Sequence, residues 1–283
     1  TPVPSSAASD VYKRQKLGEA VETLYENALI VKGEEDGSFD DADYILFMGY
    51  ANDTWNKESE TYLNLYHDTA QYYITYGTSF GKRALAMEGT ASPETAAVTD
   101  AVYTAFLEED KYNIGSLGRR WFGKRFSNDK EESFTLETPN VASGTQIDVA
   151  ARVASDGSNT TSFRLTIGGD ADAKSISGTS KTIVGSAPST SFNKLRGMIH
   201  LPQNAAESIT AKLLYDANGD LSSNGYLDFI MAQYQRNLDG AGGSFMFSLA
   251  SQDAAQQLSV AAASPETCVW ELDGDVVHMP PAG

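Results

Sequence analysis

Apolar and polar residues alternate in three stretches of the chain, at residues 147–153, 163–167 and 209–215. A period of two places one face of a β-strand on a core and the other face in water. Two shorter β-prone runs, at residues 44–47 and 72–76, are bounded by acidic or glycine-containing segments. The pattern predicts a mainly β protein, with an N-terminal β-rich domain followed by a jelly-roll-like β-sandwich domain.

The connecting segments are typical of turns, and one further segment is ambiguous. Residues 155–161 and 168–180 are rich in Gly, Ser, Thr and Asp, and Asn218-Gly219 favours a tight turn. Residues 92–110 begin with Ser-Pro-Glu, which favours a helix start. Val98, Val102 and Phe106 fit one stripe of a helix but also one face of a strand, so the pattern alone leaves both open, with a slight preference for the helix.

Composition excludes several classes of function. The 283 residues carry a net charge of −17, which argues against nucleic-acid binding because phosphate affinity needs clustered Lys and Arg. A single cysteine excludes an intrachain disulfide and a thiolate-rich zinc site. The longest apolar runs are far shorter than the roughly 20 residues of a membrane-spanning helix, so we expect no membrane-spanning segment.

Charge is unevenly distributed along the chain. Residues 19–60 hold twelve acids against Lys32 and Lys57, whereas residues 111–130 hold six basic residues against Asp129. Two solvated faces would explain this distribution. Alternatively, the basic segment docks against the acidic one or against another part of a longer parent protein.

Catalytic and metal-binding chemistry is poorly represented. Cys268 and His278 are the one Cys–His pair that could form a dyad, but Cys268 lies in a β-like segment, where an inert thiol is the commoner outcome. We therefore expect no catalytic residues and no cofactor. Asp216, Asn218 and Asp220 have the oxygen spacing of a calcium loop, yet the expected Gly and Glu at its sixth and twelfth positions are both leucine. Calcium here is the weaker alternative to a plain turn.

The two ends of the chain need separate treatment. Within residues 1–16, the run from Ser5 to Gln15 resembles a translated sequencing adapter, and we expect a disordered leader there. We expect the β-rich domain at residues 17–118 and the sandwich domain at residues 119–275. Residues 276–283, which include Pro280-Pro281, are expected to be a linker.

Three segments carry motifs in a fixed order. The first begins with Asp43-Tyr-Ile-Leu-Phe-Met-Gly49 and continues with Trp55, Tyr72-Tyr73 and Gly81-Lys-Arg83. The second is Gly118-Arg-Arg-Trp-Phe-Gly-Lys-Arg-Phe126, and the third is Gly225-Tyr-Leu-Asp-Phe-Ile230 with Arg236-Asn-Leu238 and Val269-Trp-Glu-Leu272. Over residues 22–275 these segments resemble the non-catalytic N-terminal region of gingipain-type (family C25) cysteine peptidases, most of all the type IX secretion sortases of Bacteroidota. Leu117 and Lys124 depart from the family pattern, which has Ser and Glu there.

The resemblance implies a non-catalytic β region that scaffolds a downstream caspase-like catalytic domain. It favours a strand at residues 97–108. It also implies an exported protein at the outer membrane, whose partners are its own catalytic domain and other type IX secretion components. The alternative is a stand-alone extracellular module that binds carbohydrate or mediates adhesion.

The motif residues have expected structural roles. We expect Trp121, Phe122 and Phe126 to anchor a core, and Arg119 and Arg120 to form a cation–π or ion-pair clamp with Trp121. The full set of expected structural residues is Asp43, Trp55, Tyr72, Arg119, Trp121, Phe122, Gly123, Asp228 and Trp270.

Overall fold

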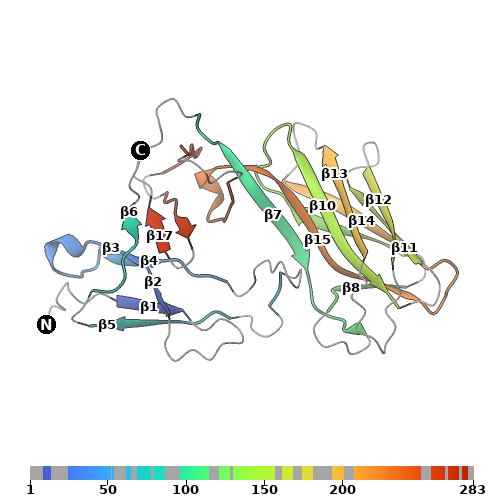
Figure 1. The fold of residues 1–283 in the computed structure, drawn as a ribbon, viewed down its shortest axis with the longest axis horizontal. Helices are drawn as coiled ribbons and strands as arrows, with labels where there is room; N and C mark the ends of the chain where they lie inside the picture. Colours follow the sequence, from blue (N-terminus) through green and yellow to red (C-terminus); the bar gives the residue numbers. More distant parts are fainter. Residues whose placement is uncertain are drawn as a thin grey trace. The chain divides into compact units, whose positions relative to one another are not determined.

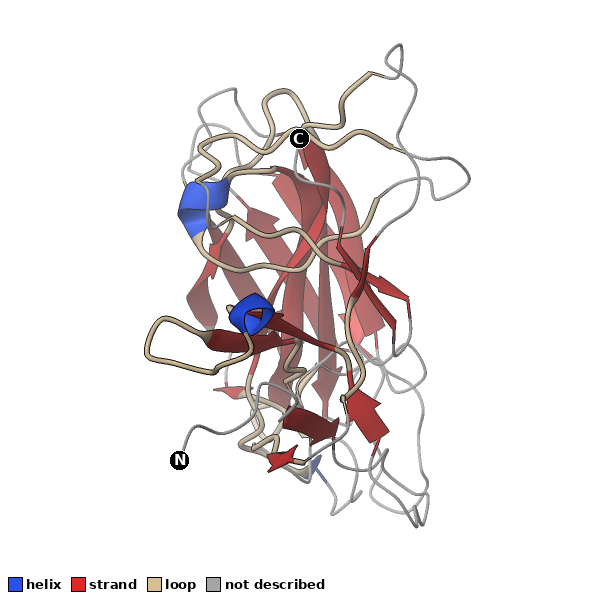
Figure 2. Cartoon of the chain, turned by 90° about the vertical axis from the view of Figure 1, so that its left-hand side faces the viewer, coloured by secondary structure: helices blue, strands red, loops and turns tan. Residues whose placement is uncertain are grey.

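The computed structural model is built from β-strands, which confirms the predicted fold class (Figure 2). It describes residues 9–13, 25–51, 53, 62–64, 69–77, 80–86, 96–114, 121–127, 130–156, 161–167, 174–180, 193–200, 207–249, 256–264, 267–273 and 276–279. The helical elements in these ranges are two short 3₁₀ turns, η1 (Glu34–Asp36) and η3 (Gly240–Gly242).

The chain forms two compact units, and the division differs from the expected domains. Unit 1 comprises residues 1–90 and 265–283, and unit 2 comprises residues 91–264. The expected boundary near residue 118 would separate β7 (Asp100–Glu108) from the sandwich. Instead, β7 pairs along its whole length with β15 (Asn224–Asn237), and these backbone hydrogen bonds hold it in unit 2.

Unit 2 is a β-sandwich of two antiparallel sheets (Figure 1). In the first sheet the strand order is β13-β10-β15-β7, with β8 (Lys124–Ser127) also paired to β15. The second sheet has the order β12-β11-β14-β9. Most consecutive strands cross from one sheet to the other, as in jelly rolls. The remaining strands are β9 (Glu131–Glu137), β10 (Gln146–Ser155), β11 (Thr161–Ile167), β12 (Lys174–Ser180), β13 (Asn193–His200) and β14 (Ser208–Asp216).

The sandwich core is made by the alternating residues that the sequence pattern identified. Ile147, Val149, Ala151 and Val153 of the first sheet are fully buried. They pack in one cluster with second-sheet residues of β11 and β14, among them Phe163, Leu165, Ile167, Ala211 and Leu213. Burial of these facing apolar side chains supplies the main stabilisation of unit 2.

Unit 1 consists of small sheets. Its strands form a three-stranded sheet β2-β1-β5, a three-stranded sheet β16-β17-β6 and the pair β3-β4. Their bounds are β1 (Ser9–Lys13), β2 (Tyr25–Asn27), β3 (Leu29–Lys32), β4 (Tyr44–Phe47), β5 (Tyr72–Tyr76), β6 (Leu85–Ala86), β16 (Glu271–Asp273) and β17 (Val276–Met279).

Both ends of the chain contribute strands where none was expected. The expected disordered leader contains β1, which pairs antiparallel with β2 on one edge and β5 on the other. The expected linker contains β17, which pairs antiparallel with β16 and parallel with β6. The sequences of these strands show no clear apolar alternation, which is why the pattern did not predict them.

Other expectations are met in part. The predicted strands at residues 44–47 and 72–76 match β4 and β5, and the ambiguous segment is the strand β7, as the family resemblance implied. The Ser- and Gly-rich segment 168–180 contains β12, which the sequence did not predict. Asn218 and Gly219 have φ of 50° and 76° and form the expected turn, although it joins strands of different sheets.

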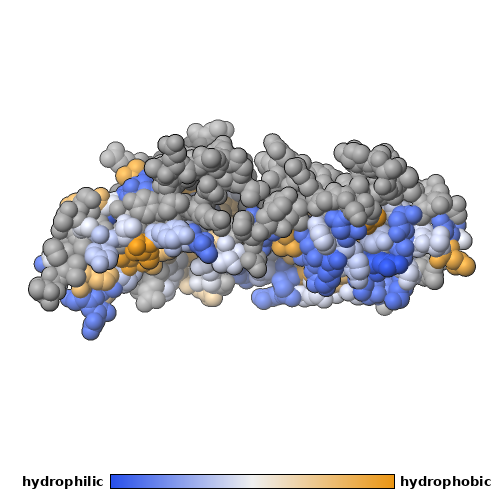
Figure 3. All heavy atoms as spheres, turned by 90° about the horizontal axis from the view of Figure 1, so that it is seen from below, coloured by the Kyte–Doolittle hydropathy of each residue, from blue (hydrophilic) through white to orange (hydrophobic). Residues whose placement is uncertain are grey.

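No helix in the described ranges is long and apolar enough to cross a membrane. On the face shown in Figure 3, hydrophilic and hydrophobic residues of the described surface are interspersed, with the hydrophobic ones in small patches.

Candidate functional site

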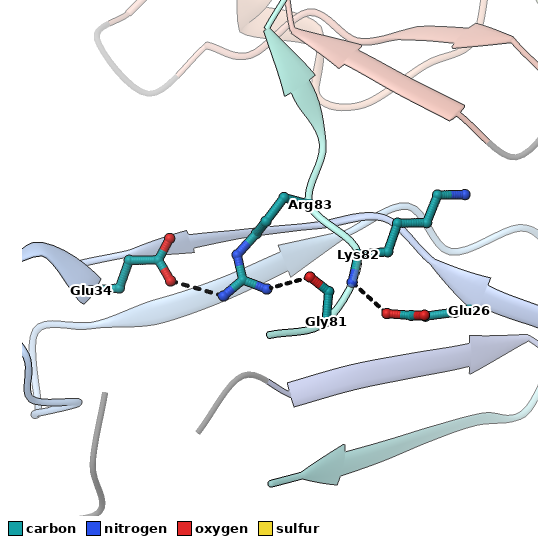
Figure 4. Close-up of polar contacts among 5 residues, drawn as sticks. All are labelled: Glu26, Glu34, Gly81, Lys82 and Arg83. Atoms are coloured by element: carbon teal, nitrogen blue, oxygen red, sulfur yellow. Dashed lines mark hydrogen bonds and ion pairs between the residues drawn. The ribbon is translucent and has the colours of Figure 1, made fainter. Parts of the chain in front are cut away.

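The Gly-Lys-Arg motif forms a polar junction inside unit 1 (Figure 4). Its backbone runs beside β3, where Lys82 O accepts a hydrogen bond from Leu29 N at 3.0 Å. Lys82 N donates to a carboxylate oxygen of Glu26, and Arg83 Nη2 donates to Glu34 Oε2 at 2.9 Å. Because the Arg83 and Glu34 side chains are 25% and 33% exposed, water screens this ion pair, and it contributes little to stability. The backbone hydrogen bonds of Leu29 with Lys82 and Ala84 set the register of the segment.

Asp43 and Tyr72 also have local structural roles in unit 1. Asp43 Oδ2 accepts a hydrogen bond from Asp40 N at 2.7 Å, and its carboxylate lies against Gly33, where a Cβ would be 1.6 Å from Oδ1. Gly33 has a φ of 92°, so both its conformation and this contact require glycine. The Tyr72 hydroxyl donates to Tyr50 O at 2.9 Å. Trp55 lies outside the described residues.

Asp228 lies at a β-bulge in the middle of β15. Along β10, Arg152 is opposite Phe229 and Val153 is opposite Leu227, which leaves Asp228 as the extra residue. The bulge coincides with the point where the second partner of β15 changes from β8 to β7. The bulge shifts the alternation of side chains by one residue, so Leu227 and Ile230 belong to the sandwich core cluster while Asp228 and Phe229, between them, do not.

The bulge places the Asp228 carboxylate on Arg152. Arg152 Nε donates to Asp228 Oδ2 at 2.7 Å, and both side chains are 1% exposed. The guanidinium carbon is also 4.6 Å from the centroid of the Phe229 ring. The sequence identified Asp228 as structural but missed Arg152, because Arg152 occupies a polar position in a clean alternating strand.

The second motif ends the segment between β7 and β8, residues 109–123, which returns to the sandwich beside this bulge. We call this segment the excursion. The chain leaves β7 at Glu109 and returns at Gly123, where an added Cβ would be 2.8 Å from both Glu109 Cβ and its carbonyl oxygen. Phe122 is 1% exposed, exchanges backbone hydrogen bonds of 2.8 Å with Tyr112, and has its ring centroid 5.7 Å from that of Tyr226. Gly123 is therefore needed for close approach, and Phe122 is the anchor that the sequence predicted.

Trp121 corrects the sequence-based expectation. Phe122 and Phe126 are buried core aromatics as expected, but Trp121 is 36% exposed and belongs to neither apolar cluster of unit 2. Adjacent residues of an extended segment point to opposite sides, so Phe122 inward implies Trp121 outward. Arg119 and Arg120 lie outside the described residues, so the expected clamp stays a prediction.

A polar network joins the ends of several strands near the same excursion. The Asp156 carboxylate accepts from the Tyr226 hydroxyl at 2.8 Å and from Asn224 N at 2.6 Å. Asn224 Oδ1 in turn accepts from Arg125 Nε at 2.9 Å. Burial, reinforced by the hydrogen bond to Asp156, raises the pKa of Tyr226 well above its usual value of 10.0. Burial likewise raises the pKa of Tyr215, whose hydroxyl bonds Ser223.

The basic segment pairs within its own unit where it is described. Lys111 Nζ lies 2.7 Å from Glu109 Oε2, and Lys124 Nζ lies 3.2 Å from Glu132 Oε1. Docking of this segment on the acidic segment or on a parent protein stays a prediction.

The weak calcium candidates form a turn. Asp216 Oδ1 accepts from Asn218 N at 2.8 Å, and Asp220 Oδ1 accepts from Ser222 Oγ at 2.7 Å. These hydrogen bonds close the turn itself. Among the residues that the structure describes, no group of three or more His, Cys, Asp or Glu side chains could hold a metal ion.

The remaining candidates are not brought together into a described catalytic arrangement. Cys268 is exposed in unit 1. His278 lies in β17 and His200 in β13, both without described side chains, and His67 is outside the described residues. Trp270 is half-buried, and its indole Nε1 is buried without a hydrogen-bond partner.

Comparison with known proteins gives one informative similarity. No family model matches the chain, and no curated protein matches it. The crystal structure of dimeric latent PorU from Porphyromonas gingivalis matches with a TM-score of 0.67 and 15% identity, over 98% of this chain and 26% of that chain. The chain thus spans about a quarter of the length of that protein.

Two carbohydrate-binding modules match much less well. A CBM61 module, TmCBM61, solved with β-1,4-galactotriose has a TM-score of 0.27 and 16% identity, over 46% of this chain and 81% of that chain. A CBM36 module solved with calcium and xylotriose has a TM-score of 0.25 and 20% identity, over 44% of this chain and 92% of that chain. At these scores they carry no argument, and the supported conclusion is that the chain has the fold of part of PorU.

Proposed function

We propose that this chain is a non-catalytic β region of a gingipain-type (C25) cysteine peptidase of the PorU kind, which scaffolds a downstream caspase-like catalytic domain. The observation that carries the proposal is the fold similarity to part of PorU, which extends over 98% of the chain and therefore over both units. A carbohydrate-binding module alone would account for unit 2 but not for unit 1.

The described motif residues support a scaffolding role. Phe122 and Gly123 hold the segment between β7 and β8 against the sandwich, and the Arg152–Asp228 pair joins β10 to β15. In unit 1, Asp43 closes a turn and Tyr72 joins β5 to Tyr50. Each contact orders the chain rather than presenting a reactive group. Under this proposal the parent protein is exported to the outer membrane, cleaves the C-terminal signals of secreted cargo there, and contacts other type IX secretion components.

The test separates scaffold, enzyme and binding module. The coding sequence beyond Gly283 is read, and the chain is produced alone and together with any downstream region. We expect a downstream His-Gly and a later Cys on caspase-like strands, peptide hydrolysis only when that region is present, and co-purification of the two parts.

Two outcomes contradict the proposal. Hydrolysis by the 283-residue chain, abolished in Cys268→Ala, would make the chain itself an enzyme. A stop codon after Gly283 combined with retention of the purified chain on a xylan or galactan matrix would favour the stand-alone carbohydrate-binding module. The matched control for retention is the same matrix with free oligosaccharide added.

A further inference from the structure

Arg236 is a buried cation near the C-terminal end of β15. The side chain lies on the same side of the strand as Ala232 and Tyr234 of the core cluster, and the residue is 4% exposed. Its guanidinium carbon is 3.8 Å from the centroid of the Phe245 ring and 4.8 Å from that of the Tyr103 ring. Two aromatic rings therefore hold the guanidinium in one position.

The guanidinium of Arg236 lacks a counter-charge in the part of the chain that the structure describes. Among the described residues, the contacts of its guanidinium are with the two rings and with no carboxylate, and its Nε is buried without a hydrogen-bond partner. Cation–π contacts offset part of the cost of burying the guanidinium, but the unmade hydrogen bond at Nε remains a cost, and it is larger for a charged group than for a neutral one. An arginine held in this way is prepared for an anionic partner.

The segment that carries Phe245 is suited to admit such a partner. Asp239 accepts from Ala241 N at 2.8 Å at one end of the segment, and Ser248 exchanges two backbone hydrogen bonds of 3.1 Å with Val102 at the other. Between these anchors Gly243 has a φ of 76°, and Met246 is 62% exposed. A shift of Phe245 between two fixed points would uncover the Nε edge of the guanidinium.

We propose that Arg236 is the receptor of a carboxylate-binding site in which Tyr103 and Phe245 orient the guanidinium. Because both rings contact the guanidinium, its in-plane N–H groups are the donors that remain for a ligand. A planar carboxylate accepts two parallel N–H bonds from a guanidinium, which matches this geometry better than a spherical anion does. The carboxylate comes either from a peptide or from a small free acid.

The test follows the Nε–Hε resonance of Arg236 by NMR in the full chain. Sodium acetate is titrated against sodium chloride at constant ionic strength, and Ac-Gly-Glu-Gly-NH₂ is compared with its Gln analogue to distinguish a peptide from a free acid. We expect a saturable shift with acetate or with the Glu peptide. Arg125, whose Nε bonds Asn224, is the internal control and should not shift in this way.

Three variants are compared with the parent chain, so that the test still gives a result if one of them folds poorly. Arg236→Lys retains the charge but loses the planar guanidinium that can donate two parallel hydrogen bonds. We expect about tenfold weaker apparent affinity. Phe245→Leu retains an apolar cover but loses the ring, and we expect a several-fold loss. As a second measure, acetate should raise Tm in the parent chain and not in Arg236→Gln. Equal Arg236 and Arg125 shifts, or an equal Tm increase in Arg236→Gln, would overturn the proposal.

Discussion

Arg152 and Arg236 lie in the same sheet of the sandwich, and both are almost fully buried against aromatic rings. They differ in their counter-charge. Arg152 donates to Asp228, which a β-bulge places beside it, whereas Arg236 has no carboxylate partner among the described residues. A buried arginine whose charge is balanced within the chain holds the fold together. One whose charge is left unbalanced indicates a place where something else binds.

The largest expected effect comes from breaking the balanced pair. Arg152→Met leaves the Asp228 carboxylate buried without its cation, and we expect a loss of about 3–5 kcal/mol in the free energy of unfolding. Arg236→Met leaves no described carboxylate without its cation. We expect it to cost no more than about 2 kcal/mol, because the loss of two cation–π contacts is offset by removal of a buried charge whose Nε has no hydrogen-bond partner. Urea denaturation followed by tryptophan fluorescence and circular dichroism measures both.

The double variant Arg152→Met with Asp228→Leu is the control for this comparison. Replacing both charges by apolar groups should recover most of the loss, because no unpaired charge remains. Equal costs for the two single arginine variants would show that the two sites do not differ in the way the structure indicates.

The strands were predictable where one face meets a core. Ile147, Val149, Ala151 and Val153 alternate along the sequence, and all four are fully buried in β10. The strand β15 was harder to predict because the bulge at Asp228 changes the phase of burial in mid-strand, so no single period describes it. The end strands β1 and β17 pair with β5 and β6, which are distant in the sequence, and the polar strand β12 pairs with β11 without an apolar alternation of its own, so a local pattern does not reveal them.

The candidate sites were predictable only in part. The motifs drew attention to Asp228, Phe122 and Gly123, and the structure gives each a close contact. Arg152 and Asp156 were missed because their partners lie about 70 residues away in the sequence. Trp121 was misjudged because its size suggested a core residue, whereas only the direction of the neighbouring Phe122 decides which side it faces.

The next prediction compares two neighbours, Phe122 and Trp121, in the segment between β7 and β8. Phe122→Ala removes a buried ring from a cluster with Ile114, Ala154 and Tyr226, and we expect a loss of about 3 kcal/mol in the free energy of unfolding. Trp121→Ala removes a ring that is 36% exposed, so we expect a loss of about 1 kcal/mol or less. The same urea titrations compare the two neighbours, and a larger cost at Trp121 would contradict the assigned orientation.

The smallest effect concerns two tyrosines of β15, Tyr226 beside Asp156 and Tyr234 near Arg236. Burial raises the pKa of both Tyr226 and Tyr234 above 10.0, and Asp156 raises that of Tyr226 further, whereas Arg236 partly lowers that of Tyr234. The folded state therefore keeps these protons at a pH where the unfolded state releases them. Stability is fully present below pH 10 and falls as the pH rises above it, by about 1.4 kcal/mol per pH unit for each tyrosine.

Variants at the two tyrosines identify which end of β15 carries this dependence. Tyr226→Phe and Tyr234→Phe should each flatten the decline of the free energy of unfolding between pH 10 and pH 11, measured by urea denaturation in half-unit steps. An unchanged slope in both phenylalanine variants would mean that neither hydroxyl is protected from ionisation in the folded state. That result would contradict the burial of Tyr226 and Tyr234.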